Sequence, residues 1–320
     1  MNMKKTFWII GAIVVVILIA IFATQAQKSD EYVVRIGYAP NIGFLPLHIA
    51  SQQGFFEKEG VKIELKELQS AQQLYEALVR KELDYVPFLS TVVVMNGEAV
   101  SSGNVKLVTV SDISLENRFD GLMVKKDSKI TTLADLKGKK IGVFPGTTGM
   151  NFLEEYLKMK GVDYTGAEFV QLPPPNQLQA LESGSIDALF SYEPNYTIGV
   201  EKFGFRTIAP ESVFASQINH AAFGGYWFST SFADQHPALA KKVAAAMDQG
   251  NEILTTDPAL ARSVAKTTYK LDDVVAEKIN LVKMVSTKDF KPEMFTSFID
   301  FLITIGELKA KPDLSNIFYK

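Results

Sequence analysis

The 320-residue chain contains no cysteine and only three histidines, so two common kinds of chemistry are missing. Without cysteine there is no disulfide, no thiolate zinc site, no cysteine nucleophile and no lipid-modified cysteine at a processed N-terminus. The histidines, His48, His220 and His236, lie far apart in the sequence, as structural or surface histidines usually do. We therefore predict no metal and no cofactor.

An excess of charge of one sign is also absent. Lysine and arginine number 33 against 36 aspartate and glutamate, a net charge of −3, so we predict no nucleic-acid partner. None of the motifs G-x-S-x-G, H-E-x-x-H or the EF-hand loop occurs, and we predict that the chain is not an enzyme. With 47% hydrophobic residues, the chain can build one large domain or two of about 150 residues each.

One long apolar run is present, at residues 7–23, directly after Lys4 and Lys5. It ends in polar residues that include Thr24-Gln25-Ala26, which offers small side chains for cleavage after Ala26. We expect residues 1–26 to be a signal peptide or an N-terminal membrane anchor, because the length of the run fits both. The rest of the chain is then periplasmic or extracytoplasmic, anchored to the cytoplasmic membrane by residues 7–23 in the second case.

From residue 32 onward, short β-rich runs alternate with helical patterns, which predicts an α/β protein with mostly parallel sheets flanked by helices. This alternation occurs in two series, one up to residue 110 and one from residue 133. Residues 121–124 and 221–228 are predicted as strands that cross between the two series. Almost all of the chain after them carries helical patterns.

The predicted organisation is therefore two lobes joined by two hinge crossings. Residues 27–118 form the first part of lobe I, and residues 119–220 form lobe II. Residues 221–320 return to lobe I and end in a C-terminal helical segment. Gly224 and Gly225, in the return crossing, are interpreted as part of the hinge rather than as ligand contacts.

Ligands of parallel sheets bind beyond the carboxyl ends of the strands, so the turn after each predicted strand is a candidate site. Five turns carry glycine or polar side chains that could contact a solute. The candidate ligand-binding residues are Asn41, Gly43, Ser70, Ser90, Thr91, Gly146, Thr147, Thr148, Tyr192 and Glu193. Capping of the next helix explains Ser70 and Ser90 equally well, and Glu193 could likewise cap the helix that follows it.

The turn at residues 146–149 is the strongest single motif. Gly-Thr-Thr-Gly follows a predicted strand and opens an amphipathic helix, so its hydroxyl and backbone N–H groups could hold an oxyanion. It lacks the Lys-Ser/Thr pair of a nucleotide-hydrolase phosphate loop. A flat aromatic ligand would instead stack on Tyr192.

Five segments recur in the order found in one known family. They are GYAPNIGFLPLHIASQQGFFEKEGVKIEL at 37–65, LADLKGKKIGV at 133–143, the glycine–threonine helix start at 146–149, IDALFSYEP at 186–194 and HPALAKKV at 236–243. In these segments the chain resembles solute-binding proteins of ABC importers, specifically the nitrate, sulfonate and taurine group. The resemblance covers roughly residues 32–310 and implies a two-lobed type II periplasmic-binding-protein fold.

The resemblance also implies a function: capture of a small polar or anionic organic molecule in an interlobe cleft. Its partners would be an ABC permease and the permease's cytoplasmic ATPase, and the chain would be a monomer. The residues that correspond to cleft-lining loops are Asn41, Gly43, Ser70, Ser90, Thr147, Thr148 and Tyr192. The same superfamily includes binders of thiamine-pyrimidine precursors and a pyrimidine-synthesis enzyme, so a heterocycle binder, an enzyme and a sensor lobe stay open as alternatives.

Overall fold

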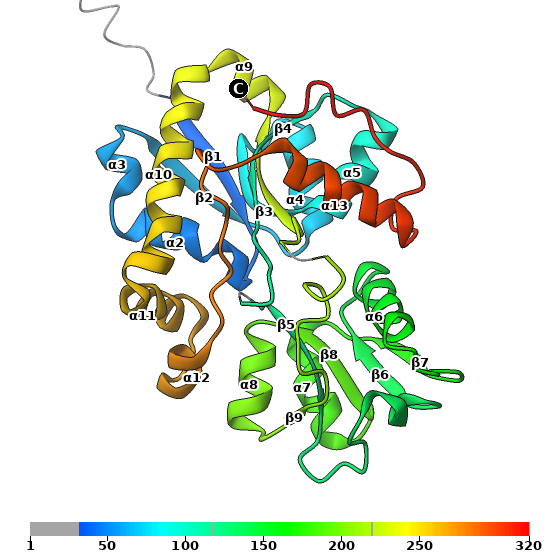
Figure 1. The fold of residues 1–320 in the computed structure, drawn as a ribbon. Coiled ribbons are helices and arrows are strands. Elements are labelled where there is room, and N and C mark those ends of the chain that lie inside the picture. Colours follow the sequence, from blue (N-terminus) through cyan, green and yellow to red (C-terminus); the bar gives the residue numbers. More distant parts are fainter. Residues whose placement is uncertain (1–31, 117, 219, 320) are drawn as a thin grey trace, which may run out of the picture.

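The computed structural model describes residues 32–116, 118–218 and 220–319, which fold into two lobes (Figure 1). Each lobe is built on a five-stranded sheet, with strand order β2-β1-β3-β10-β4 in lobe I and β7-β6-β8-β5-β9 in lobe II. The apolar run at residues 7–23, expected to be a signal or an anchor, lies outside the described residues. No helix within the described part of the chain is both long and apolar enough to cross a membrane.

The sheet of lobe I has one reversed strand. Its strands are β1 (Val33–Tyr38), β2 (Lys62–Glu67), β3 (Tyr85–Ser90), β4 (Val105–Val110) and β10 (Gly224–Ser229). β1 pairs in parallel with β2 and β3, whereas β10 runs antiparallel between β3 and β4. The central strands β3 and β10 are apolar and almost entirely buried, while the edge strand β2 is charged and exposed.

Short and long helices cover this sheet. They are η1 (Ile42–Phe44), α2 (Leu45–Gln52), α3 (Phe55–Lys58), α4 (Ala71–Val79), α5 (Thr91–Val100), α9 (Thr230–Gln235), α10 (Pro237–Thr256) and α11 (Pro258–Tyr269). Residues 45–58 form two helices, α2 and α3, rather than one. The helix is interrupted at Gly54, whose φ of 68° lies in the left-handed region that ends helices.

The sheet of lobe II repeats the same pattern. Its strands are β5 (Asp120–Val124), β6 (Lys140–Val143), β7 (Glu168–Gln171), β8 (Ala188–Tyr192) and β9 (Arg206–Thr207), and its helices are η2 (Leu133–Leu136), α6 (Thr148–Met159), α7 (Pro174–Ser183) and α8 (Asn195–Lys202). β5 is the reversed strand, antiparallel to β8 and β9. The proline triplet at 173–175 does more than end a strand, because its last two prolines open α7.

The reversed strand of each sheet directly follows a crossing between the lobes. The chain leaves lobe I after β4 and enters lobe II at β5, then returns to lobe I at β10 (Figure 1). The two connections pair with each other at Ile113 and Ala221, where the Ala221 N–H donates to the Ile113 carbonyl at 2.8 Å. Trp227 of β10 is fully buried in lobe I, next to Phe295. The predicted α/β two-lobed fold with mostly parallel sheets is confirmed.

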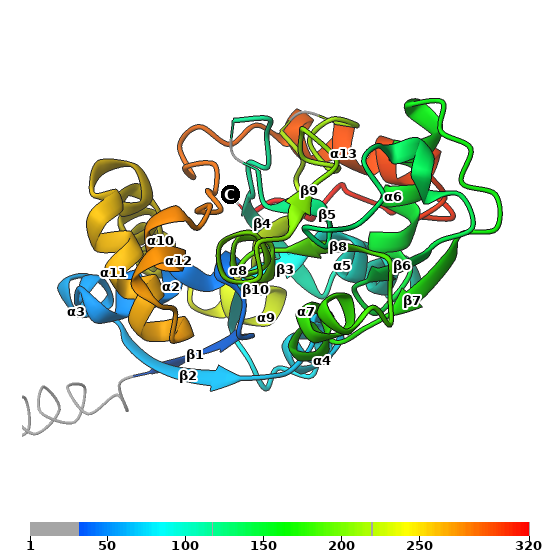
Figure 2. The ribbon, with the colours of Figure 1, turned by 90° about the horizontal axis from the view of Figure 1, so that it is seen from below.

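The C-terminal segment touches lobe II on two sides. Helix α12 (Asp273–Lys278) packs on α8, and the rings of α13 (Pro292–Thr304) pack against Phe152 of α6. Figure 2 shows α10, α11 and α12 gathered on one side of the molecule and α6 on the opposite side. The prediction that almost all of this segment is helical is wrong for residues 279–291 and 305–319, which lie outside the helices.

Candidate functional site

The turn after β1 is held from two directions. The Asn41 side chain caps η1 by accepting from the Gly43 N–H at 3.0 Å. The Asn41 carbonyl accepts from the hydroxyl of Tyr269, at the end of α11, at 2.7 Å. Tyr269 also packs its ring on His48, whose pKa is lowered by burial. A helix far along the chain therefore positions this predicted turn.

The predicted hydroxyls of lobe I lie in different environments. Ser70 is exposed and caps α4 by accepting from the Gln73 N–H at 3.2 Å. Ser90 precedes α5 without a side-chain cap bond. Thr91 is fully buried and donates to the Ala222 carbonyl at 2.5 Å, so it ties α5 to the return crossing. Contact of these residues with a solute stays a prediction.

The glycine–threonine turn at the start of α6 already binds a carboxylate. The Thr148 hydroxyl donates to Glu307 Oε2 at 2.8 Å, and Asn151 Nδ2 donates to Glu307 Oε1 at 2.5 Å. Glu307 comes from the segment after α13 and is buried. Gly146 donates its N–H to Gln171 Oε1 at 3.0 Å, and Thr147 is exposed. The side chains of this turn can therefore hold an acidic group.

Tyr192, at the end of β8, lies among aromatic rings. Its ring stacks on Phe119 with centroids 5.1 Å apart and an angle of 13° between the planes. Burial, and after it the charges of Asp120 and Glu307, raises the pKa of Tyr192. The hydroxyl therefore stays protonated near neutral pH and can donate a hydrogen bond.

Five rings meet where the lobes join, and we call them the interlobe aromatic cluster. They are Phe88, Phe119, Tyr192, Phe214 and Phe223. Phe88 comes from lobe I, Phe119 precedes β5, and Phe223 precedes β10. The neighbouring centroids lie between 4.9 and 6.4 Å apart, typical of interacting aromatic rings. Of these five rings, only Tyr192 was predicted from the sequence; a phenylalanine at the end of each crossing was the available signal.

The position of Phe88 depends on two glycines from distant parts of lobe I. A Cβ at Gly43 would come within 2.0 Å of the Phe88 ring, and one at Gly224 within 2.9 Å. Phe88 itself has a φ of 55°, in the left-handed region that side chains rarely adopt. Gly43, predicted as a ligand contact, thus makes room for an aromatic ring beside the boundary.

Glu193 is buried and fully bonded by the protein. Its carboxylate accepts from the N–H and hydroxyl of Thr197, at 3.2 and 2.8 Å, and from Asn280 Nδ2 at 2.5 Å. Burial raises the pKa of Glu193, although these donors oppose the shift. Of the two interpretations offered from the sequence, these contacts match the capping of α8, and contact with a solute stays a prediction.

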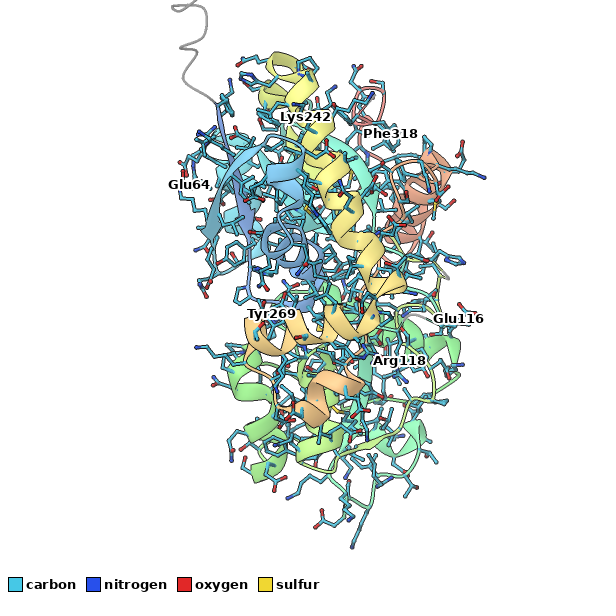
Figure 3. All side chains as sticks on the ribbon, turned by 90° about the vertical axis from the view of Figure 1, so that its left-hand side faces the viewer. Glu64, Glu116, Arg118, Lys242, Tyr269 and Phe318 are labelled. Atoms are coloured by element: carbon cyan, nitrogen blue, oxygen red, sulfur yellow. The ribbon has the colours of Figure 1, made fainter. Side chains whose placement is uncertain are left out.

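Asp120 and Arg118 anchor the first crossing, and both were missed in the sequence. The Asp120 carboxylate is fully buried and accepts from the Ser212 hydroxyl at 2.5 Å and the Val213 N–H at 2.7 Å. Burial raises the pKa of Asp120 to about 6. The Arg118 guanidinium lies over the Tyr196 ring at 4.7 Å, at the level where the lobes meet in Figure 3.

A metal ion would need a group of side chains among the described residues that could bind it. No group of three or more histidine, aspartate and glutamate residues in that part could hold a metal ion. The acidic side chains near the cluster are instead engaged with hydroxyl, amide and backbone N–H donors.

The chain is similar to binding proteins over nearly its whole length. A Bacillus subtilis (strain 168) protein named as an aliphatic sulfonates-binding protein is 27% identical, with 96% of this chain and 94% of that protein covered. The Escherichia coli periplasmic aliphatic sulphonate binding protein SsuA has a TM-score of 0.74 at 20% identity, covering 90% and 92%. The nitrate-binding protein NrtA from Synechocystis PCC 6803 has a TM-score of 0.66 at 15% identity, covering 87% and 82%.

Enzymes also share this fold. The desulfurization enzyme DSZB has a TM-score of 0.68 at 17% identity, covering 89% of this chain and 96% of its own. The resemblance to ABC-importer binding proteins drawn from the sequence is confirmed by the relatives above. The sequence model of one family matches residues 27–269, and the chain belongs to that family, the NMT1-like family.

Proposed function

We propose that this chain is the extracytoplasmic solute-binding component of an ABC importer, which captures a small organic anion of the sulfonate type and delivers it to a permease. Two contacts carry this proposal: Thr91, after β3 of lobe I, donates to the Ala222 carbonyl of the return crossing, and Tyr192, at the end of β8 of lobe II, stacks on Phe119 of the first crossing. A solute that touches both lobes stabilises their closed arrangement through its higher affinity for that arrangement.

Three further features support the proposal. The Thr148 and Asn151 side chains bind the carboxylate of Glu307, so the start of α6 has donors suited to an acidic group. The relatives at nearly full length are named for binding aliphatic sulfonates. The apolar run at residues 7–23 would export the chain or anchor it at the membrane. We expect binding and release without turnover.

Thermal unfolding of the full chain in a mild detergent tests the proposal, with ethanesulfonate, taurine and nitrate as solutes and sodium chloride as the matched salt control. A solute present at 100 times its Kd stabilises the folded chain by about 2.7 kcal/mol, which raises Tm by several degrees. No rise in Tm with any of the three solutes beyond the chloride control would overturn the proposal.

A further inference from the structure

The interlobe aromatic cluster is a feature that a small alkanesulfonate does not require. Phe119 and Phe223 end the two crossings, directly before β5 and β10, and their ring centroids lie 5.8 Å apart. Phe88 reaches Phe119 from lobe I at 6.2 Å, and Tyr192 stacks on Phe119 from lobe II at 5.1 Å. Lobe I, lobe II and both crossings therefore each contribute an aromatic ring to the cluster.

The backbone around Phe88 is arranged for its ring. Phe88 adopts a positive φ, and its ring occupies space that a side chain at Gly43 or Gly224 would fill. Non-glycine residues in this backbone region are strained and cluster at ligand sites, because ordinary core packing can be achieved without that strain. The arrangement points to a role of the ring beyond filling the core.

One edge of the cluster is accessible, although Phe88 and Phe119 are themselves buried, and Tyr192 supplies a hydrogen-bond donor. The rings of Tyr192 and Phe223 are half-buried, and Phe144, whose ring lies 5.7 Å from that of Tyr192, is 38% exposed. Among the described residues we find no hydrogen bond to the Tyr192 hydroxyl. A polar donor beside flat apolar faces suits a ligand that has an aromatic ring and an acceptor oxygen.

We propose that the solute of this chain is an aromatic acid, whose ring packs against Phe88, Phe119 and Tyr192 and whose acid oxygen accepts the Tyr192 hydroxyl. This inference rests on the proposed function and narrows its substrate class. The solute's ring replaces part of the contact that the five rings make with one another. An alkanesulfonate with a short chain offers no such surface.

Isothermal titration of the full chain in a mild detergent tests the inference with three sulfonates that share one acid group: benzenesulfonate, cyclohexanesulfonate and ethanesulfonate. We expect benzenesulfonate to bind at least about tenfold more tightly than ethanesulfonate, and more tightly than cyclohexanesulfonate, which has similar size but no π face. Equal affinities for benzenesulfonate and either of the other two overturn the inference and leave the proposed function standing. Binding of none of the three overturns both.

Variants of Tyr192 test whether its ring causes the tighter binding of benzenesulfonate. Tyr192→Leu should reduce benzenesulfonate affinity to that of ethanesulfonate, while Tyr192→Phe should keep most of the preference because it keeps the ring. Tyr164→Leu is the matched control, since Tyr164 is a half-buried tyrosine of lobe II that packs on Phe169 outside the cluster. A Tyr192→Leu chain that unfolds cooperatively and keeps the full preference overturns the inference.

Discussion

Two of the regions where the lobes meet use different forces. At the centre, the interlobe aromatic cluster joins them through ring packing, which has broad geometric preferences and persists over a range of spacings. At the flank formed by α8 and α12, directional polar contacts join them: Lys278 pairs with Glu201 at 2.7 Å, Lys202 pairs with Asp272, and Glu193 holds Asn280.

This difference assigns each region a role in lobe movement. Directional hydrogen bonds and ion pairs are satisfied in one geometry, so the α8–α12 flank keeps its arrangement when the lobes rotate. Aromatic rings, in contrast, can move apart and then contact a solute that lies between them. We therefore expect the α8–α12 flank to act as a pivot and the centre to admit the solute.

The largest effect should come from Asp120, which directly follows Phe119 and whose carboxylate accepts directional hydrogen bonds from Ser212 and Val213. Its folded-state pKa is raised to about 6 from an ordinary value of 3.8. As the pH rises from about 4 to about 6, this carboxyl is already ionised in the unfolded chain but still protonated in the folded chain. The folded chain therefore binds more protons in this range, and the free energy of unfolding falls as the pH rises, by up to about 3 kcal/mol. Urea unfolding at several pH values measures this slope.

Asp120→Asn is the control for that slope. Asparagine keeps the size and one of the two acceptor oxygens but does not titrate, so the fall in unfolding free energy between pH 4 and pH 6 should be shallower in this variant. The slope that remains belongs to other buried carboxyls with raised pKa values, including Glu193 and Asp248. Identical slopes in the two chains would show that Asp120 does not titrate in this range.

The next effect concerns the room that Gly43 leaves for Phe88. Gly43→Ala places a Cβ within 2.0 Å of the ring, so the ring must move, and we expect a loss of about 2 kcal/mol in unfolding free energy. If crowding is the cause, Gly43→Ala should cost much less in a chain that already carries Phe88→Ala. Urea unfolding of the four chains measures the coupling, and purely additive losses would contradict it.

At the flank, Glu193→Ala should cost about 1.5 kcal/mol in unfolding free energy, because Thr197 and Asn280 lose a buried acceptor. The cost is modest because the substitution also removes a carboxylate whose burial is itself unfavourable. Asn280→Ala tests the pairing through a double-mutant cycle measured by urea unfolding. A coupling energy near zero would mean that this hydrogen bond does not join the flank.

The local parts of the fold could be predicted from the sequence. The described strands lie within about three residues of the predicted runs, because alternating apolar segments and turn residues act over short distances. The capping role of Ser70 was equally readable, since its hydroxyl accepts from Gln73 of the helix that follows it, whereas the same prediction is wrong for Ser90, which makes no side-chain cap bond. A hydroxyl that caps a helix and one that also binds a solute look the same in sequence, so the solute contacts stayed undecided.

The aromatic and acidic parts of the site could not be predicted because they depend on distant segments. Phe88 fits only because Gly43 and Gly224, from separate elements, both leave room. Glu307 reaches Thr148 across 159 positions of sequence, from a segment whose pattern predicted only helix. Contacts of this kind arise from the packing of the two lobes and leave no periodic signal along the chain.

The smallest effect should come from the exposed ion pairs of the flank. Lys278→Ala removes a contact whose lysine is 55% exposed, so we expect a loss of about 0.5 kcal/mol in unfolding free energy that disappears at high salt. Lys266→Ala is the matched control, because Lys266 pairs with Asp273 within the C-terminal segment rather than between lobes.

Small-angle scattering should show a wider range of lobe orientations for the double variant Lys202→Ala/Lys278→Ala than for Lys266→Ala. Equal scattering from these chains would mean that the flank's ion pairs do not fix the pivot, leaving that role to the buried Glu193–Asn280 contact.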